Sequence, residues 1–291
     1  MGNAKSDPIA TPQQRRPRID NPKYVVEWQR LKHRLRLLRK WWLRPHLPYQ
    51  PVFVIATCRS GSNLLVSYLD QMPSVTVLGE LLCTLLPHGI RYDKVSPTQA
   101  VKHIRYCLQG ERGGVRGCKL MLYQLANCQL TMDSLDAAFP QAKYIVLYRE
   151  SLADQYVSHQ KAIATRQFLL RPGEQRKRTE LTIDPAHLRA YCDDIRRGYR
   201  NVLDHSWLHG RSVVLSYEQL VAEPDHWLEQ HICPLLGVPF VAPTTKLCKQ
   251  NTEPLAQQIT NYRDVASLLH SPLCRQHHHG PVPLQGQPRA A

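Results

Sequence analysis

The sequence predicts an α/β fold of three layers, in which helices cover both faces of a mostly parallel central sheet. Two kinds of observation support this prediction. Residues 52–56 (VFVIA) form a short continuous apolar run, as expected of a strand buried on both faces, and residues 143–148 (KYIVLY) and 212–217 (SVVLSY) are similar. Stretches of helical pattern separate these runs, and alternating strands and helices are typical of a parallel sheet.

The expected elements follow one another along the chain in this alternating order. Strands are predicted at 52–56, 117–120, 143–148 and 212–217. Helices are predicted over about ten residues from Leu64 and near 97–109, 131–138, 151–165, 185–205, 225–236 and 254–269. Residues 166–180 (RQFLLRPGEQRKRTE) interrupt the pattern with Pro, Gly and clustered basic residues, so a mobile basic loop is expected there.

Length and composition indicate a globular protein with a large domain. The chain has 291 residues, of which 43% are hydrophobic and 21% charged, which excludes wholesale disorder. No apolar run approaches the ~18–20 residues that span a bilayer, and the first residues lack the apolar core of a secretory signal. We divide the chain into a flexible tail (1–22), a basic amphipathic helix (23–46), a main domain (50–270) and a disordered end (271–291).

The nine cysteines are scattered, odd in number and never spaced as C-x-x-C. This pattern argues against a disulfide framework and a zinc site, and it favours a reducing, cytoplasmic compartment.

The basic charge is concentrated near the N-terminus. Of the net charge of +15, residues 1–44 contribute +9 and the remaining 247 residues only +6. Nucleic-acid-binding domains spread their basic charge over a folded face, so no nucleic-acid partner is expected. Within 23–46, an apolar stripe recurs at helical spacing among Lys and Arg residues, which suits either packing on the domain or peripheral contact with an anionic membrane. The first residues, MGNAKS, also fit the pattern for myristoylation at Gly2.

The most informative segment connects the first strand to the first helix. A loop over 57–63 contains the candidate anion-binding residues Arg59, Ser60, Gly61, Ser62, Asn63 and, at the helix start, Leu64. Unpaired N–H groups at a helix start favour an anion, a glycine permits close approach, and an arginine supplies a fork matched to phosphate oxygens. The loop lacks G-x-x-x-x-G-K-[ST], so it is not the usual nucleoside-triphosphate loop.

A second candidate anion site follows the strand 143–148. Arg149 stands at its carboxyl end, where ligands of open α/β sheets gather, and Ser158 lies nine residues on, in the next helix. Both side chains can point into one crevice and share a second phosphate.

These segments together resemble sulfotransferases that use 3′-phosphoadenosine-5′-phosphosulfate (PAPS), especially the carbohydrate and bacterial glycolipid branch, over residues 50–270. T-x-RSGS-x-LL looks like the family's 5′-phosphosulfate loop and YRESLADQYVS like its 3′-phosphate motif. GCKLM (117–121), SYEQL (216–220) and KQNTEPLAQQITNY (249–262) match further segments, and the last suggests that Lys249 touches a cofactor phosphate. The resemblance implies the P-loop nucleotide-hydrolase-like sulfotransferase fold. Asn63, Cys58 and the longer Arg-to-Ser spacing depart from the usual pattern and leave the subfamily open.

The resemblance implies transfer of a sulfuryl group from PAPS to a hydroxyl of a glycan, glycolipid or small metabolite, with adenosine 3′,5′-bisphosphate leaving. No metal is expected, since neither of the last two predicted strands, 143–148 and 212–217, ends in an Asp or Glu that could hold magnesium. Arg59, with Lys119 as a further cation, is expected to stabilise the leaving phosphate. Glu80, an isolated carboxylate in an apolar stretch, is the predicted general base because burial raises its pKa, and His88 and His159 are alternatives.

Two other functions fit parts of the pattern. A small-molecule kinase on the same scaffold would need magnesium and ATP. The loop 57–63 lacks the Lys-Ser/Thr pair of the usual nucleoside-triphosphate loop, which argues against a kinase. A non-catalytic anion-binding adaptor, held at membranes by residues 23–44, would bind acidic vesicles without turnover. The basic loop 166–178 and Arg91 can receive an anionic acceptor, but the acceptor's identity and the oligomeric state stay open.

Overall fold

The computed structural model describes residues 35, 48–83, 95–170, 173–245, 247 and 253–278. Several predictions fall outside these residues: the tail 1–22, nearly all of the helix 23–46, Gly2, and the candidate residues His88, Arg91 and Lys249. The predicted α/β fold is confirmed in the part of the chain that is described.

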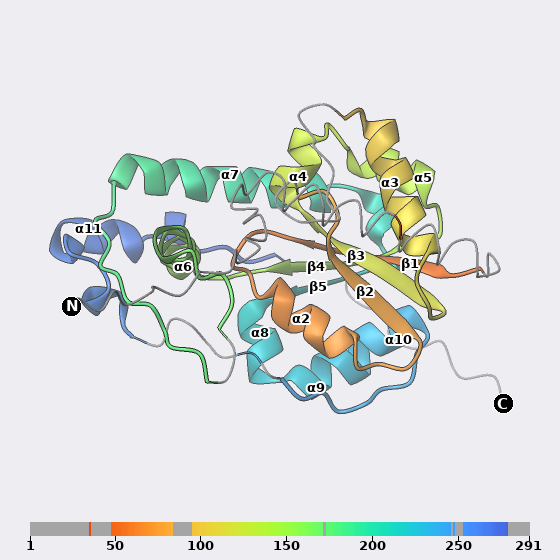
Figure 1. The fold of residues 1–291 in the computed structure, drawn as a ribbon. Helices are drawn as coiled ribbons and strands as arrows, with labels where there is room; N and C mark the ends of the chain where they lie inside the picture. Colours follow the sequence, from red (N-terminus) through yellow and green to blue (C-terminus); the bar gives the residue numbers. More distant parts are fainter. Residues whose placement is uncertain are drawn as a thin grey trace, which may run out of the picture.

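A five-stranded sheet forms the centre of the molecule, and every pair of neighbouring strands is parallel (Figure 1). The strands lie in the order β2-β3-β1-β4-β5. Their bounds are β1 Gln50–Ala56, β2 Val75–Glu80, β3 Val115–Met121, β4 Lys143–Tyr148 and β5 Ser212–Ser216. Since β1 is central, the loop that follows it opens at the middle of the sheet's carboxyl edge.

The helices connect these strands on both sides. Their bounds are α2 Ser62–Leu69, α3 Pro97–Gln109, α4 Leu122–Asn127, α5 Met132–Ala138, α6 Leu152–Thr165, α7 Pro185–Leu203, α8 Tyr217–Ala222, α9 Pro224–Trp227, α10 Cys233–Leu236 and α11 Tyr262–Leu269. Local signals explain several starts: Ser96 forms a capping box with Gln99 before α3, and Asp184 caps α7 with Pro185 in its first turn.

The predicted elements agree with the structure except at five places, one of which is helix α8, which was not expected and begins at Tyr217, where the last strand was expected to end. Strand β2 and helix α4 were not expected, because VTVLGE is short and LYQLAN follows β3 without a turn signal. The helix expected at 225–236 consists of α9, the wider turn η3 (Leu228–Ile232) and α10. The helix expected at 254–269 is a short turn, η4 (Leu255–Gln257), followed by α11.

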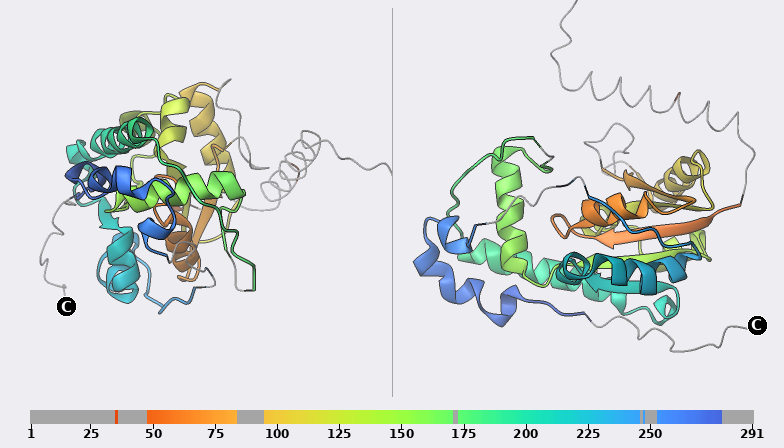
Figure 2. Two further views of the ribbon diagram at one scale, coloured as in Figure 1. Left: turned by 90° about the vertical axis from the view of Figure 1, so that its left-hand side faces the viewer. Right: turned by 90° about the horizontal axis from the view of Figure 1, so that it is seen from below.

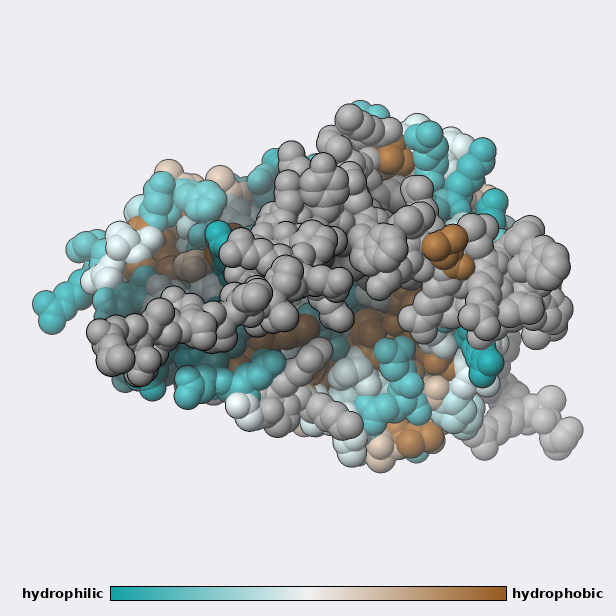
Figure 3. Space-filling model, in the orientation of Figure 1, coloured by the Kyte–Doolittle hydropathy of each residue, from teal (hydrophilic) through white to brown (hydrophobic). Residues whose placement is uncertain are grey.

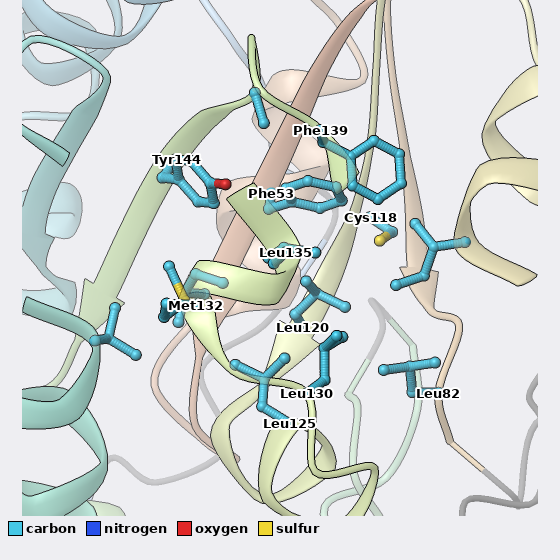
Figure 4. Packing of buried hydrophobic residues seen from close by; sticks show 14 of the residues in the cluster. Phe53, Leu82, Cys118, Leu120, Leu125, Leu130, Met132, Leu135, Phe139 and Tyr144 are labelled. Atoms are coloured by element: carbon cyan, nitrogen blue, oxygen red, sulfur yellow. The ribbon is translucent and has the colours of Figure 1, made fainter. Parts of the chain in front are cut away.

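Side chains of β1 alternate between two hydrophobic layers, as strand geometry requires. Phe53 and Ile55 pack with residues of α3, α4, α5 and α7, whereas Val52 and Val54 pack with residues of α2, α8 and α10. In the first layer, the Phe53 ring lies 5.1 Å from that of Phe139 and 5.9 Å from that of Tyr144 (Figure 4). The two layers bury the sheet on both faces and keep its strand ends fixed.

Helix α6 stands across the carboxyl ends of the strands rather than along a face of the sheet (Figure 2). It packs in a third hydrophobic cluster with α7, α11 and the turn η5 (Pro272–Cys274). Helix α6 therefore lies beside the loop that follows β1, at the carboxyl edge of the sheet.

The predicted disordered end is wrong in its first part, residues 271–278. Arg275 pairs with Ser151 in an isolated antiparallel β-bridge. Gln276 donates from its backbone N to Glu150 O at 3.0 Å and from its side-chain Nε2 to Arg149 O at 2.8 Å. Cys274 and Gln276 are buried, so their contacts with α7 and with the end of β4 order a segment whose composition suggests a tail.

None of the helices in the described ranges is long and apolar enough to cross a bilayer. On the face drawn in Figure 3, the described surface is largely hydrophilic, with hydrophobic residues showing in small areas. All eight described cysteines are free thiols.

Candidate functional site

The loop between β1 and α2 has a backbone that few residues adopt. Arg59 and Gly61 both have positive φ, 64° and 89°, and a Cβ on Gly61 would lie 2.4 Å from Cδ2 of Tyr217. Gly61 is the N-cap of α2 and makes no side-chain capping bond. Leu64 N donates back to Gly61 O at 2.9 Å, whereas the N–H groups of Ser62 and Asn63 come too early in α2 to have an acceptor within the helix, so this end can receive an anion.

Buried polar side chains support this loop from the interior of the protein. Gln155 Nε2 donates to Thr57 Oγ1 at 2.6 Å and to Cys58 O at 2.7 Å. The Tyr199 hydroxyl donates to Leu147 O at 2.7 Å and lies 3.1 Å from Thr57 Oγ1. Neither Gln155 nor Tyr199 was predicted as a site residue, because each reaches the loop from a helix far along the chain, α6 and α7 respectively.

Ser60 belongs to the support of the loop. Its side chain is fully buried, and its Oγ donates to Thr57 O at 2.9 Å. By contrast, Ser62, Asn63 and Leu64 line the cleft beside the loop. Ser60 N also donates to Thr57 O, at 3.4 Å, and Ser60 does not line the cleft, so among the predicted anion-binding residues it stands apart as a structural support of the loop.

Arg59, Arg149 and Ser158 meet in one cleft of about 300 Å³. Arg59 Nε donates to Ser158 Oγ at 2.9 Å and its Nη1 to Phe168 O, while Arg149 Nη1 lies 3.5 Å from Arg59 O. Burial, with Arg149 nearby, lowers the pKa of Arg59 below its ordinary value. Two guanidinium groups crowded at one cleft favour an anion there.

Two residues after β5 fix the orientation of Arg149. Its guanidinium lies 5.0 Å from the centre of the Tyr217 ring, and its Nε forms an ion pair with Glu218 Oε1 at 3.7 Å. Tyr217 and Glu218 belong to the SYEQL segment, so the sequence contained this signal without showing what it contacts.

The remaining wall of the cleft is mostly apolar. Phe168 and Leu169 are 52% and 41% exposed although they are large hydrophobic residues, and both line the cleft. Val221 is exposed as well, and Tyr217 completes this wall. The flat ring of a ligand can lie against such a surface while the ligand's charged groups reach Arg59 and Arg149.

Glu80, Lys119 and Asn63 form a polar cluster at the carboxyl ends of β2 and β3. Lys119 Nζ donates to Asn63 Oδ1 and lies 3.4 Å from Glu80 Oε1. Gln124 Nε2 donates to Glu80 Oε2 at 2.9 Å, and the Tyr123 hydroxyl lies 3.4 Å from the same oxygen.

This cluster corrects the description of Glu80 as an isolated carboxylate in an apolar stretch. The carboxylate ends an unexpected strand, has a cationic partner, and keeps 21% of its side chain exposed, against 6% for Lys119. It is therefore oriented by three neighbours and accessible from outside. The link through Asn63 joins it to the start of α2.

Cys58 and His159 also lie close to the cleft. Burial, reinforced by Glu80, raises the pKa of Cys58 to about 11, so its thiol stays protonated near neutral pH. Burial and the Arg59 charge lower the pKa of His159, and its Nδ1 has no hydrogen-bond partner among the described residues. His159 is thus a neutral imidazole beside Arg59, on the helix that also bears Ser158.

Comparison with known protein families found a model that matches part of the chain. A sequence model described as the sulfotransferase family matches residues 119–242, which include Lys119, Arg149 and Ser158. No curated protein sequence matches the chain.

Similar solved structures include three sulfotransferases. One from Alicyclobacillus acidocaldarius is 14% identical, with a TM-score of 0.45, over 71% of this chain and 88% of that one. STF1 from Mycobacterium tuberculosis is 13% identical, with a TM-score of 0.44, over 75% and 76%. Mouse SULT7A1, complexed with PAP, is 13% identical, with a TM-score of 0.41, over 66% and 61%.

Proposed function

We propose that this chain is a PAPS-dependent sulfotransferase that sulfates a hydroxyl group of a glycan, glycolipid or small metabolite. The observation that supports this most is the meeting of Arg59 and Arg149 at one cleft, beside an uncapped helix start. The match of residues 119–242 to the sulfotransferase family supports the same reaction class.

The residues of the cleft fit a donor with two phosphorylated ends. At one end, Arg59 and residues 60–64, of which 61–64 line the cleft, would hold the 5′-phosphosulfate. At the other, Arg149 and Ser158 would hold the 3′-phosphate, with Tyr217 and Glu218 orienting the guanidinium. Lys249, by resemblance, would add a further phosphate contact.

When bound, PAPS supplies the sulfuryl group that passes to the acceptor oxygen. Arg59 and Lys119 are the cations placed to balance negative charge that develops on the phosphate side. Lys119 reaches the loop through Asn63, so its charge lies at the start of α2. Neither role requires a metal ion in this proposal.

Glu80 is the proposed general base that accepts the proton of the acceptor hydroxyl. Gln124 and Tyr123 fix Oε2, Lys119 lies beside Oε1, and the side chain stays partly exposed. A carboxylate held in this way can receive a proton without reorienting. His159 is less suited, since burial and the Arg59 charge lower the pKa of its imidazole and it does not line the cleft.

Binding and transfer measurements on the full chain test this function. Calorimetry should show that adenosine 3′,5′-bisphosphate binds far more tightly than ATP with magnesium or NAD. Radiolabelled PAPS should transfer its label to a hydroxyl acceptor from a panel of glycans, glycolipids and phenols. Preferential binding of ATP with magnesium would instead indicate a kinase, and binding to acidic vesicles without any transfer would indicate an adaptor. A cytoplasmic location is part of the proposal, and for residues 23–44 both alternatives stay open, packing on the domain and peripheral contact with a membrane surface.

A further inference from the structure

Two buried thiols from distant parts of the chain meet between α7 and the turn η5. Cys192 lies on the helix and Cys274 in the turn, and their sulfur atoms are 3.7 Å apart across 82 residues of sequence. Both side chains are buried in the cluster that also holds α6 and α11, and both thiols are free. The distance exceeds the ~2.05 Å of an S–S bond, so the two sulfur atoms are in contact but not joined.

The surroundings of the pair favour a thiolate at Cys274. The hydrogen bond with Cys192 lowers the pKa of Cys274, against the effect of burial. Ser271 and the charges of Arg196 and Arg189 lower this pKa further. The same hydrogen bond raises the pKa of Cys192, which therefore keeps its proton. A thiolate beside a second thiol is the arrangement in which one sulfur attacks an oxidant and the other displaces the product.

The pair lies directly beneath an exposed turn of the surface. Pro272 and Arg275, which flank Cys274 in η5 and just after it, are exposed. The Arg196 guanidinium of α7 donates to the backbone oxygens of both residues and holds the turn in place. Local opening of this turn is therefore sufficient to bring the Cys274 sulfur to a small oxidant in solution.

The segment that carries Cys274 also contacts the end of β4. Two residues on, Gln276 donates to Glu150 O at 3.0 Å and to Arg149 O at 2.8 Å. These hydrogen bonds hold the backbone at Arg149, beside the cleft. With both thiols reduced, only hydrogen bonds and packing fasten residues 271–278 to the domain, and an S–S bond would add a covalent link to α7.

We propose that Cys192 and Cys274 form a reversible disulfide that fastens residues 271–278 to α7 when the protein meets a peroxide. The proposed sulfate transfer uses neither thiol, so this modification site is separate from the cleft. Only its consequence for Arg149 rests on the proposed function.

With hydrogen peroxide as the oxidant, the Cys274 thiolate attacks one peroxide oxygen, and the O–O bond breaks to give a sulfenic acid and hydroxide. The Cys192 sulfur then attacks the sulfenic sulfur, so that the S–S bond forms as the S–O bond breaks, and the oxygen leaves as water. The two sulfur atoms together lose two electrons to the peroxide. The hydroxide takes up the proton that Cys274 released, which gives a second water molecule. A dithiol such as dithiothreitol reverses the step by thiol–disulfide exchange.

The experiment compares reduced and peroxide-treated full chain. After alkylation of the remaining thiols, peptide mass spectrometry should find Cys192 linked to Cys274. The melting temperature should rise by about 5 °C or more, because the link closes an 82-residue loop in the unfolded chain. The backbone N–H of Gln276 should exchange its hydrogen at least about tenfold more slowly, since opening of the segment is then restricted. Dithiothreitol should reverse both effects.

Three variants locate the effect. Cys192→Ala and Cys274→Ala, made separately, should each abolish the difference between treated and reduced protein. Comparing both states of the same variant removes any effect of the substitution on stability. Cys233→Ala is the matched control and should keep the full difference, because Cys233 is another buried thiol whose sulfur lies 3.7 Å from Met72 Sδ, a thioether that cannot form a disulfide.

Two results would overturn the proposal. The first is a digest in which Cys192 and Cys274 stay unlinked while other cysteines are oxidised. The second is a link that lowers the melting temperature or leaves the exchange of Gln276 unchanged, since the segment would then not be fastened. Calorimetry with adenosine 3′,5′-bisphosphate on the reduced protein is a separate test: failure to bind contradicts the proposed function, whereas the disulfide is judged by the mass spectrum and the exchange rates alone.

Discussion

The Arg59 guanidinium donates through Nε to the Ser158 hydroxyl at 2.9 Å, across 99 residues of sequence. The first residue follows the central strand β1, and the second lies in α6, which crosses the strand ends. This contact joins the two segments that we assign to opposite ends of the donor. It brings both segments to one cleft, so under the proposed function their cations would act on the same ligand.

Replacing Arg59 with Ala should weaken adenosine 3′,5′-bisphosphate by roughly two orders of magnitude. The change removes charge-assisted hydrogen bonds in a partly buried site, and such bonds contribute the largest polar terms to phosphate binding. Calorimetry measures the affinity directly. Arg112→Ala, which removes an exposed arginine away from the cleft, is the control, and unchanged affinity for Arg59→Ala would contradict the loop assignment.

Replacing Glu80 with Gln should leave bisphosphate affinity intact and reduce turnover by ~10²–10⁴. The amide keeps the shape of the side chain but cannot accept a proton at neutral pH. Initial rates of sulfate transfer at saturating PAPS measure the effect. His159→Gln is the matched comparison for the alternative base. Near-normal turnover for Glu80→Gln would exclude its role as base.

Replacing Gly61 with Ala should impair donor binding more than stability. The φ of 89° is strained for any L side chain, and the new Cβ meets the Tyr217 ring at 2.4 Å. Bisphosphate affinity and the melting temperature, compared for both proteins, distinguish the two effects. Adding Tyr217→Ala removes the clash but also a contact of Arg149, so the double variant should not recover binding.

Replacing Gln155 with Leu should destabilise the protein by about 1–3 kcal/mol and weaken the bisphosphate. The change leaves Cys58 O and Thr57 Oγ1 without a buried donor, so the backbone around Arg59 loses its support. Chemical denaturation and calorimetry measure the two effects. Thr165→Ala, near the other end of α6, should lower stability without the same loss of affinity.

His159 should make the folded state less stable in mild acid. Its pKa is lowered in the folded state, so below pH ~6.5 the unfolded chain binds a proton that the folded chain resists. Stability is therefore complete above the unfolded pKa and is lost as pH falls through the folded pKa. His159→Gln should flatten denaturation midpoints measured from pH 7 to 5, whereas His209→Gln, at an exposed site, should not.

Much of the fold could be predicted because its signals are local. The apolar runs at 52–56 and 143–148 are short and continuous, as in strands buried on both faces, and Gly61 and Arg59 directly after the first run predict an anion-binding loop there. Strand β2 escaped prediction because six residues of mixed polarity, ending at Glu80, give no clear period. The order of segment 271–278 was not predicted because it depends on partners far away in the sequence, among them Arg149 O.

The sequence by itself determined the α/β architecture, the loop at 57–63 and the candidates Arg59, Arg149, Ser158 and Glu80, since local periodicity and residue chemistry suffice for these. Only the tertiary structure decided which of them meet. The hydrogen bonds of Gln155 to the loop, the ion pair of Glu80 with Lys119, and the hydrogen bond of Arg59 to Ser158 all join residues far apart in the chain. Such contacts arise from strand order and helix packing, which no local pattern specifies.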